Sequence, residues 1–278
     1  MIDPTKESDA KTSLPQQIGE RFWTNYYYAR MRLLRRLSRR RRAQTQERIP
    51  ALVINYNRLT WPKAMCEVLE TWNVEPILLD NKSTYPPLLE WYANCPYKVI
   101  RLKHNLGHLA PWKSGVAYQL GKYYMVSDPD LDLGGIPSDA PERLLRQLQS
   151  CPNLRKVGLG LEIQDLPDTE IAKSAREWES KFWADRVSEG FFEAMVDTTM
   201  ALYDAEREEV DFFAAHRSDY PYVAKHLPWH QVGELTEEES YYLKSITKRT
   251  HWSYVEAAPI SEPANQVQRQ GTDLQKTP

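Results

Sequence analysis

Two aspartates separated by one proline, Asp128 and Asp130, are the residues whose type and spacing point most directly to chemistry. Alternate side chains of an extended backbone share a face, so both carboxylates can be directed at one hard cation. Pro129 fixes its own φ and favours an extended Asp128, which prepares this geometry before a metal arrives. The pair predicts a Mn²⁺ or Mg²⁺ site in which Asp130 binds the metal and Asp128 binds the metal or a ribose hydroxyl. An acidic turn capping the following helix is the alternative, and it is commoner for an isolated D-x-D.

Two histidines and an aspartate of the second half are candidates to complete such a site. The segment YVAKHLPWH places His226 and His230 on either side of a tryptophan. A histidine satisfied within a core or loop is an equally open interpretation. Asp197 lies in the apolar stretch MVDTTMALY, where an unpaired charge is costly and needs a partner or a task. It is the predicted catalytic base for an acceptor hydroxyl, and a structural pair with an arginine is the alternative.

The elements that must position these residues alternate between strand and helix patterns. Strand-like apolar runs occupy residues 51–56, 75–80, 97–102, 122–128 and 155–163. Helical patterns lie between them, over 60–72, 83–95, 109–120 and 138–150. Such alternation predicts an α/β fold with a Rossmann-like, mostly parallel (mixed) sheet and helices on both faces. The later part changes character, with a long helix over 169–185, strand material over 191–204 and 210–216, and a capped helix over 236–247.

Polar residues follow the first four of these strands. Ligands of open parallel sheets bind at the carboxyl ends of the strands, so side chains from these positions are expected to converge. The predicted ligand-binding residues, in chain order, are Tyr56, Asn57, Arg58, Asp80, Asn81, Asn105, Gly107 and Asp128. Any one polar loop is more often unremarkable surface, and the succession of four along one sheet edge favours a binding site.

The same residues carry a family resemblance. The groups Tyr56-Asn57, Asp80-Asn81-Lys82-Ser83, Asn105-Leu106-Gly107 and Asp128-Pro129-Asp130 stand in this order. In this respect the chain resembles the A-type (GT-A) nucleotide-diphospho-sugar glycosyltransferases, in particular the family 2-like bacterial enzymes. The resemblance covers about residues 50–165, and the Glu-Asp base motif of the family has no counterpart that aligns in the second half.

The resemblance implies roles for individual residues. Tyr56, Asn57 and Asp80 would contact the nucleoside, and Asn105 would support the donor pocket. Asp128 and Asp130 would hold the ribose and the metal. Because many enzymes of this fold complete the metal site with a late histidine, His226 would be the third metal ligand, with His230 as the alternative. Asp197 would deprotonate the acceptor hydroxyl or orient the sugar. Trp112, beside the donor loop, is a candidate to stack on a sugar, although an aromatic residue here is more often part of a core.

We therefore expect a metal-dependent glycosyltransferase that uses a nucleotide-diphosphate sugar, with a UDP-sugar as the favoured donor. A glycan or lipid-linked hydroxyl would be the acceptor, in surface polysaccharide or glycoconjugate synthesis, with inversion or retention left open. A sugar-phosphate nucleotidyltransferase is the rival enzyme, but NYNRLTWPKA lacks the glycines of a triphosphate-binding loop. A non-catalytic interaction protein with a basic helix on a degenerate transferase scaffold is the rival outside enzymes.

The net charge of −2 conceals a strongly basic segment. Residues 21–48 hold ten Arg and one Glu, and apolar residues recur within them at helical spacing. This predicts a basic amphipathic helix whose residues 21–42 meet an anionic membrane surface, with packing on the catalytic domain as the alternative. The acidic remainder, without a recognisable nucleic-acid fold, argues against nucleic-acid binding. We expect a cytoplasmic protein, peripheral on the inner face of the membrane, with reduced cysteines.

These patterns divide the chain into five parts. We expect a disordered leader over 1–20, the basic amphipathic helix over 21–48, a nucleotide-sugar-binding half over 49–165, an acceptor-binding half of the same domain over 166–257 and a disordered tail over 258–278.

Overall fold

The computed structural model describes residues 26–37, 47–207 and 214–246 of the chain. The expected leader over 1–20 and the expected tail over 258–278 lie outside the described residues, as does the arginine run at 39–42. Among the described residues, no helix has both the length and the apolar character needed to cross a bilayer. The three cysteines, all within the described part, are free thiols.

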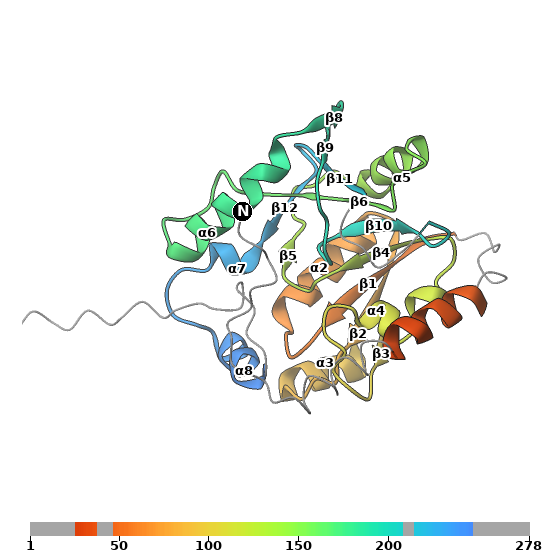
Figure 1. Cartoon of the computed structure of the whole chain (residues 1–278). Helices are drawn as coiled ribbons and strands as arrows, with labels where there is room; N and C mark the ends of the chain where they lie inside the picture. Colours follow the sequence, from red (N-terminus) through yellow and green to blue (C-terminus); the bar gives the residue numbers. More distant parts are fainter. Residues whose placement is uncertain (1–25, 38–46, 208–213, 247–278) are drawn as a thin grey trace, which may run out of the picture.

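A nine-stranded sheet forms the centre of the molecule, in the order β3-β2-β1-β4-β10-β6-β11-β9-β8 (Figure 1). Its first four strands are β1 (Ile49–Asn55), β2 (Val74–Asp80), β3 (Lys98–Arg101) and β4 (Tyr123–Ser127). The others are β6 (Lys156–Gly158), β8 (Arg186–Ser188), β9 (Phe191–Glu193), β10 (Ala201–Asp204) and β11 (Ala215–Ser218). Strands β3, β2, β1 and β4 are parallel, whereas β10 runs antiparallel to both β4 and β6. The prediction of a mostly parallel, mixed α/β sheet is confirmed.

Helices cover both faces of the sheet. The helical elements are 26–37, α2 (Thr60–Thr71), α3 (Pro86–Asn94), α4 (Ala110–Lys113), η2 (Ala117–Gln119), α5 (Ala140–Ser150), α6 (Glu170–Ser180), η3 (Lys181–Trp183), α7 (Leu227–His230) and α8 (Glu237–Ser245). Helices α2, α5 and α6 pack on one face, and the helix 26–37, α4 and η2 pack on the other.

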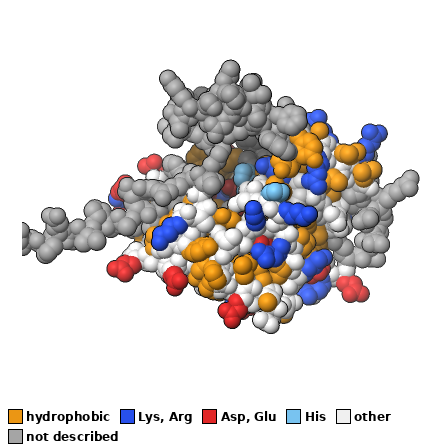
Figure 2. All heavy atoms as spheres, turned by 90° about the horizontal axis from the view of Figure 1, so that it is seen from below, with side chains coloured by type: hydrophobic (Ala, Val, Ile, Leu, Met, Phe, Trp, Pro, Cys, Tyr) orange, Lys and Arg blue, Asp and Glu red, His pale blue; other side chains and the backbone are white. Residues whose placement is uncertain are grey.

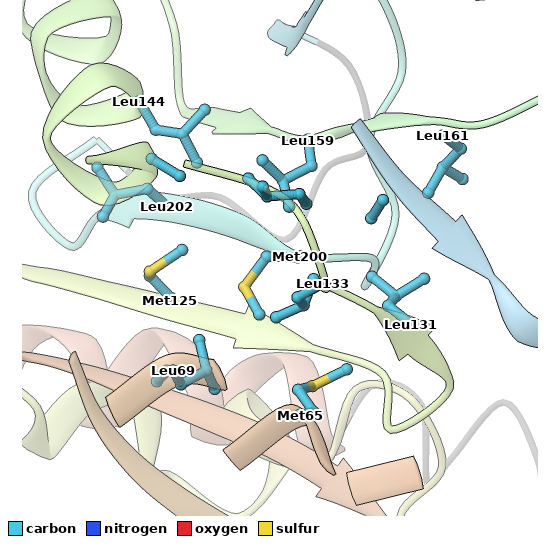
Figure 3. Packing of buried hydrophobic residues seen from close by; sticks show 14 of the residues in the cluster. Met65, Leu69, Met125, Leu131, Leu133, Leu144, Leu159, Leu161, Met200 and Leu202 are labelled. Atoms are coloured by element: carbon cyan, nitrogen blue, oxygen red, sulfur yellow. The ribbon is translucent and has the colours of Figure 1, made fainter. Parts of the chain in front are cut away.

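The alternation of buried residues along β1 explains this double cover. Ala51 and Val53 join one core, and Leu52 and Ile54 join the other, because successive strand residues point to opposite faces. In the first core, Met65 and Leu69 of α2 lie opposite side chains of β4 and β10 (Figure 3). Both faces are thus apolar, and polar side chains are left to the strand ends.

A second, three-stranded sheet has the order β5-β12-β7 and is built from β5 (Leu131–Asp132), β7 (Gly160–Leu161) and β12 (Val223–His226). In it, His226 is the register partner of Leu131, and the Leu227 amide donates to the Asp130 carbonyl at 2.9 Å. This pairing brings the end of β12 directly beside the residues that follow β4.

Three expected elements are each divided in the structure. The strand predicted over 155–163 becomes β6 and β7, because the chain changes partners between Gly158, which pairs in the large sheet, and Gly160, which pairs in the small sheet and lies against the Ser218 carbonyl. The helix predicted over 109–120 ends in α4, since Gly115 has a φ of +87°, a conformation that favours glycine. The strand material over 191–204 becomes β9 and β10, and residues 194–200 form a loop that carries Asp197.

The helix 26–37 packs on the domain by one side. Met31 is 4% exposed and joins the second core, and Leu34 lies against Gly115. Arg30 donates to the backbone carbonyls of Lys113 and Ser114. This part of the basic segment therefore packs on the domain, as the alternative to membrane docking expected. A different side of the helix carries an exposed apolar stripe of Tyr26, Leu33 and Leu37.

Candidate functional site

The two aspartates after β4 lie at the centre of a polar cluster. The Thr198 hydroxyl donates a hydrogen bond to the Asp128 carboxylate, with its oxygen 2.9 and 2.8 Å from the two carboxylate oxygens. Asp130 forms an ion pair with Arg58 through Oδ2 at 2.6 Å, and Oδ1 lies 3.8 Å from Nε2 of His226. Oδ1 is buried and has no hydrogen-bond partner among the described residues. Asp132, two residues on, is exposed and turns back to the Gly134 amide.

The ionisation of Asp128 is strongly disfavoured by its surroundings. Burial raises the pKa of this carboxyl well above its ordinary value, and the neighbouring charges of Asp130 and Asp197 raise it further. A divalent cation would offset this repulsion and displace the proton.

His226, rather than His230, is the histidine beside Asp130. Its ring is 8% exposed and packs on Trp229 with 4.3 Å between ring centroids. Burial lowers the pKa of His226, and a neutral imidazole is the form that binds metals. The ring of His230 instead lies with Nδ1 at 3.8 Å from Asp165.

Asp197 reaches the same cluster from the 194–200 loop. Burial acts to raise its pKa, but the charge of Arg217, hydrogen bonds from Thr199 and the charge of His226 outweigh burial, so the pKa is lowered. The Thr199 amide donates to Asp197 Oδ1 at 3.0 Å. Asp128 and Asp197 therefore shift in opposite directions, which is a pattern of functional carboxylate pairs.

The donor atoms of this cluster fit half of a divalent-cation site. Among the described residues, no group of three or more His, Cys, Asp or Glu side chains has a metal-binding arrangement. Asp128, Asp130 and the nearby His226 nevertheless supply oxygen and imidazole donors, and Asp130 Oδ1 is buried without a partner in the described part of the chain. Mg²⁺ is commonly held by one or two carboxylates plus substrate phosphates, which is what this pair could provide.

The residues after β1 and β2 form a second polar group. Asn57 has a φ of +54° and accepts hydrogen bonds from the amides of Thr84 and Tyr85, at 2.6 and 3.0 Å. Asp80 is fully buried, accepts from the Ser83 amide at 3.1 Å and pairs with Arg101 at 3.3 Å. These contacts hold the loops after the two strands against one another.

Asn81 connects this group to the loop after β3. Its side-chain amide donates to the Gly107 carbonyl at 3.1 Å, and its oxygen accepts from the Leu106 amide at 3.1 Å. Asn105 is exposed and accepts from the Gly107 amide at 2.9 Å. Asn81 therefore positions the loop rather than presenting its side chain to solvent.

Trp112 lies elsewhere than its predicted role requires. Its side chain is 2% exposed in the second core, and its indole N–H donates to the hydroxyl of Tyr124 at 3.0 Å. The ring also packs edge-on against Tyr203. A sugar could not stack on the Trp112 ring in this position, because the second core encloses the ring.

Helix α8 covers the loop after β1, a feature that sequence patterns missed. The Tyr56 hydroxyl donates to the Ser245 carbonyl at 3.1 Å, and Asn57 donates to the Ser245 hydroxyl at 2.9 Å. Arg58 pairs with Glu239 at 3.0 Å. The only local signal was the cap, in which Thr236 accepts from the Glu239 amide at 3.2 Å. The cap predicts that a helix begins here, but it does not predict that this helix packs against the loop after β1.

A cavity of about 280 Å³ lies beside helix α8. It is lined by the start of α2, with Thr60 and Trp61, and by residues of α7, α8 and their connection. Among the described residues, buried polar atoms without a hydrogen-bond partner include His230 Nε2, Gln231 Oε1 and Glu239 Oε1, all from residues lining this cavity.

No protein-family model matches this chain, and no curated protein matches its sequence. One solved structure that it resembles is glucosyl-3-phosphoglycerate synthase from Mycobacterium tuberculosis in complex with phosphoglyceric acid, at 15% identity and a TM-score of 0.36. That likeness covers 57% of each chain. Another is 4-diphosphocytidyl-2C-methyl-D-erythritol synthase, at 14% identity and a TM-score of 0.35, covering 72% of this chain and 98% of the other. TM-scores this low carry no argument about function, which rests on the geometry of the site.

Proposed function

We propose that the protein is a metal-dependent glycosyltransferase that moves a sugar from a nucleotide-diphosphate donor, with a UDP-sugar favoured, to a glycan or lipid-linked hydroxyl. The observation that carries the proposal is the carboxylate pair after β4. Asp130 Oδ1 is buried, has no hydrogen-bond partner among the described residues, and lies 3.8 Å from the His226 ring. An oxygen in this setting favours a cation as its partner.

Each residue of the cluster has a task in this proposal. Asp130 and Asp128 would hold Mn²⁺ or Mg²⁺, and His226, whose Nε2 lies 3.8 Å from Asp130 Oδ1, would have to move to become the third protein ligand. The metal would neutralise charge that develops on the leaving nucleoside diphosphate. Asp197, ionised at neutral pH because its pKa is lowered, accepts the proton of the acceptor hydroxyl.

The donor's nucleoside would bind at the ends of β1, β2 and β3. Tyr56, Asn57 and Asp80 are the proposed contacts, and Asn81 sets the position of Asn105 and Gly107. The nucleotidyltransferase alternative is not favoured, because residues 56–59 between β1 and α2 contain no glycine with which to wrap a triphosphate.

The first test of the proposed function is binding. We expect a UDP-sugar with Mn²⁺ to raise the Tm by several degrees, since a ligand at about 100 times its Kd stabilises by about 2.7 kcal/mol. Asp130→Asn should lose the Mn²⁺-dependent part of this shift. The measurement is a thermal-shift panel of UDP-, GDP-, CMP- and dTDP-sugars with and without Mn²⁺.

A matched control is available two residues away. Asp132→Asn makes the same change at an exposed carboxylate and should keep the wild-type shift. The proposal fails if none of the nucleotide sugars shifts the Tm of the wild-type protein under either condition.

We further propose that the helix 26–37 docks on an anionic membrane surface. Tyr26, Leu33 and Leu37 are 48%, 56% and 68% exposed and share a side of the helix, with exposed Arg32 and Arg36 beside them. Figure 2 shows Lys and Arg mixed with hydrophobic side chains over the underside of the domain, with Asp and Glu mostly at its edge. An apolar stripe flanked by arginines suits anionic lipid, which a lipid-linked acceptor would place nearby.

Sedimentation with vesicles tests this docking. We expect Leu33→Ser/Leu37→Ser to lower binding to phosphatidylserine-containing vesicles about tenfold or more, because two exposed apolar anchors are removed. Val187→Ser, which removes an apolar residue that is 42% exposed elsewhere, should bind as wild type. Equal binding by all three proteins, or equal binding to neutral vesicles, would contradict the docking surface.

A further inference from the structure

Two adjacent glutamates of α8 contact the start of α2 and its neighbouring arginine. Glu238 Oε1 accepts from the backbone amides of Leu59 and Thr60, at 2.8 and 3.1 Å. Glu238 Oε2 accepts from the Thr60 hydroxyl at 2.8 Å. Helix α2 has neither a side-chain cap nor an acidic residue in its own first turn. A carboxylate from the far end of the chain therefore fills the anion-attracting end of this 12-residue helix.

Glu239, the next residue of α8, is paired with Arg58. Its Oε2 accepts from Arg58 Nη2 at 3.0 Å, and both side chains are almost fully buried. The guanidinium lies between the rings of Trp61 and Tyr242, at 4.5 and 3.9 Å from their centroids. Arg58 Nε and Glu239 Oε1 are buried without hydrogen-bond partners among the described residues. The pairing thus leaves both a donor and an acceptor unused.

Four groups donate hydrogen bonds to these two carboxylates, although the charge of Asp130, which shares Arg58, also acts on Glu239. They are two backbone amides at a helix N-terminus, one hydroxyl and one buried guanidinium. The same donors are found in phosphate-binding sites, where a helix N-terminus supplies backbone amides and an arginine supplies charge-assisted hydrogen bonds. The cavity of about 280 Å³ beside Thr60 and Glu239 provides space next to them.

We propose that the N-terminus of α2 and Arg58 form a diphosphate-binding subsite, and that Glu238 and Glu239 occupy it in place of phosphate oxygens, so that α8 is a lid displaced by the anion. The subsite would bind the diphosphate of the proposed sugar donor. It rests on the proposed function only for the identity of that donor. Arg58 also holds Asp130 at 2.6 Å, so the subsite adjoins the proposed metal site.

The attachment of α8 suits a displaceable element. Its single fully buried residue is Glu239, and the half-buried rings of Tyr241 and Tyr242 pack on Tyr85 and Tyr56, with 4.9 and 6.4 Å between ring centroids. The connection before it contains Val232, which is 68% exposed, and Gly233, whose φ is +86° with open space around it. Segments with few buried apolar side chains open at low free-energy cost.

Inorganic pyrophosphate in EDTA tests the lid without metal or sugar, and UDP in EDTA forms a second arm. In wild type, we expect saturating pyrophosphate to increase hydrogen exchange of the amides in 237–245. Glu238→Gln/Glu239→Gln should bind pyrophosphate about tenfold more tightly, because a competitor within the chain is weakened. Glu237→Gln, an exposed glutamate on the same helix, is the matched control and should bind as wild type.

The outcomes separate the lid from the proposed function. Pyrophosphate that binds and opens α8, even where no nucleotide sugar binds with Mn²⁺, supports the subsite while the donor assignment fails. Mn²⁺-dependent nucleotide-sugar binding without any change in α8 exchange overturns the lid and leaves the function. The lid is equally overturned if the double variant binds pyrophosphate no more tightly than Glu237→Gln. If the double variant does not fold, the hydrogen exchange of 237–245 in the wild-type protein, with and without pyrophosphate, is the test of the lid.

Discussion

Asp197→Asn should lower the kcat of sugar transfer by roughly 10²- to 10⁴-fold while the Kd for the nucleotide sugar and Mn²⁺ stays close to wild type. Asparagine keeps the size of the side chain and an acceptor for the Thr199 amide, which donates to Asp197 Oδ1 at 3.0 Å. It cannot take up a proton. A loss in kcat with unchanged donor affinity is therefore the signature of a catalytic base.

The substitution Asp197→Asn leaves the backbone contacts of this residue in place. Its carbonyl accepts from Lys156 at 3.3 Å and from the Tyr203 hydroxyl at 3.2 Å, contacts that the substitution leaves in place. Because the pKa of Asp197 is lowered, the base form persists below the ordinary aspartate range, and the rate should show no acid limb from this group near neutral pH. Asp185→Asn, an exposed carboxylate of the same half, is the control and should keep the wild-type rate.

Steady-state kinetics and thermal shift, measured on the same variants, decide the outcome. A wild-type kcat in Asp197→Asn would remove the residue from the proposed mechanism. A loss of donor affinity together with kcat would instead indicate that Asp197 orients the sugar.

Glu179→Ala should lower the free energy of unfolding by about 3–5 kcal/mol, because it leaves a buried arginine without its partner. Glu179 Oε2 lies 2.5 Å from Arg217, and the two side chains are 4% and 5% exposed. The pair joins α6 to β11. Denaturant unfolding of the purified protein is the measurement.

Two further variants show whether the cost comes from the unpaired charge. Glu177→Ala, on the exposed side of the same helix, should stay within about 0.5 kcal/mol of wild type. Glu179→Ala/Arg217→Met should be more stable than Glu179→Ala but less stable than wild type, because it removes the unpaired guanidinium and also removes the charge that stabilises ionised Asp197. A double variant as unstable as the single one would show that the unpaired guanidinium is not the main cost of Glu179→Ala.

The same arginine connects stability to the site. Arg217 Nε donates to the Met195 carbonyl at 2.8 Å, within the loop that carries Asp197, and its charge lowers the pKa of Asp197. The alternative that Asp197 interacts with an arginine is thus part of the observed geometry. Asp197 also lies close enough to Asp128 and His226 to interact electrostatically with them, so its interaction with Arg217 does not exclude the proposed role as base.

Local patterns predicted most elements of the first half. The apolar runs of β1, β2 and β4 and the helical spacing of α2 and α5 depend on residues a few positions apart, which is why periodicity identifies them. The same reasoning failed for α4 and for the split between β6 and β7. There a glycine conformation or a change of strand partner decides the outcome, and neither follows from apolar spacing.

The carboxylate pair, the polar strand ends and the mostly parallel sheet could be predicted from the amino-acid sequence, because each prediction depends on side-chain alternation or on the order of elements. Which distant groups lie beside them became clear from the three-dimensional packing. The pairing of β12 with β5 brings His226 beside Asp130, Trp112 is enclosed by a core, and α8 lies across the residues after β1. These are contacts between segments far apart along the chain, and such contacts depend on packing of the whole fold rather than on any local pattern.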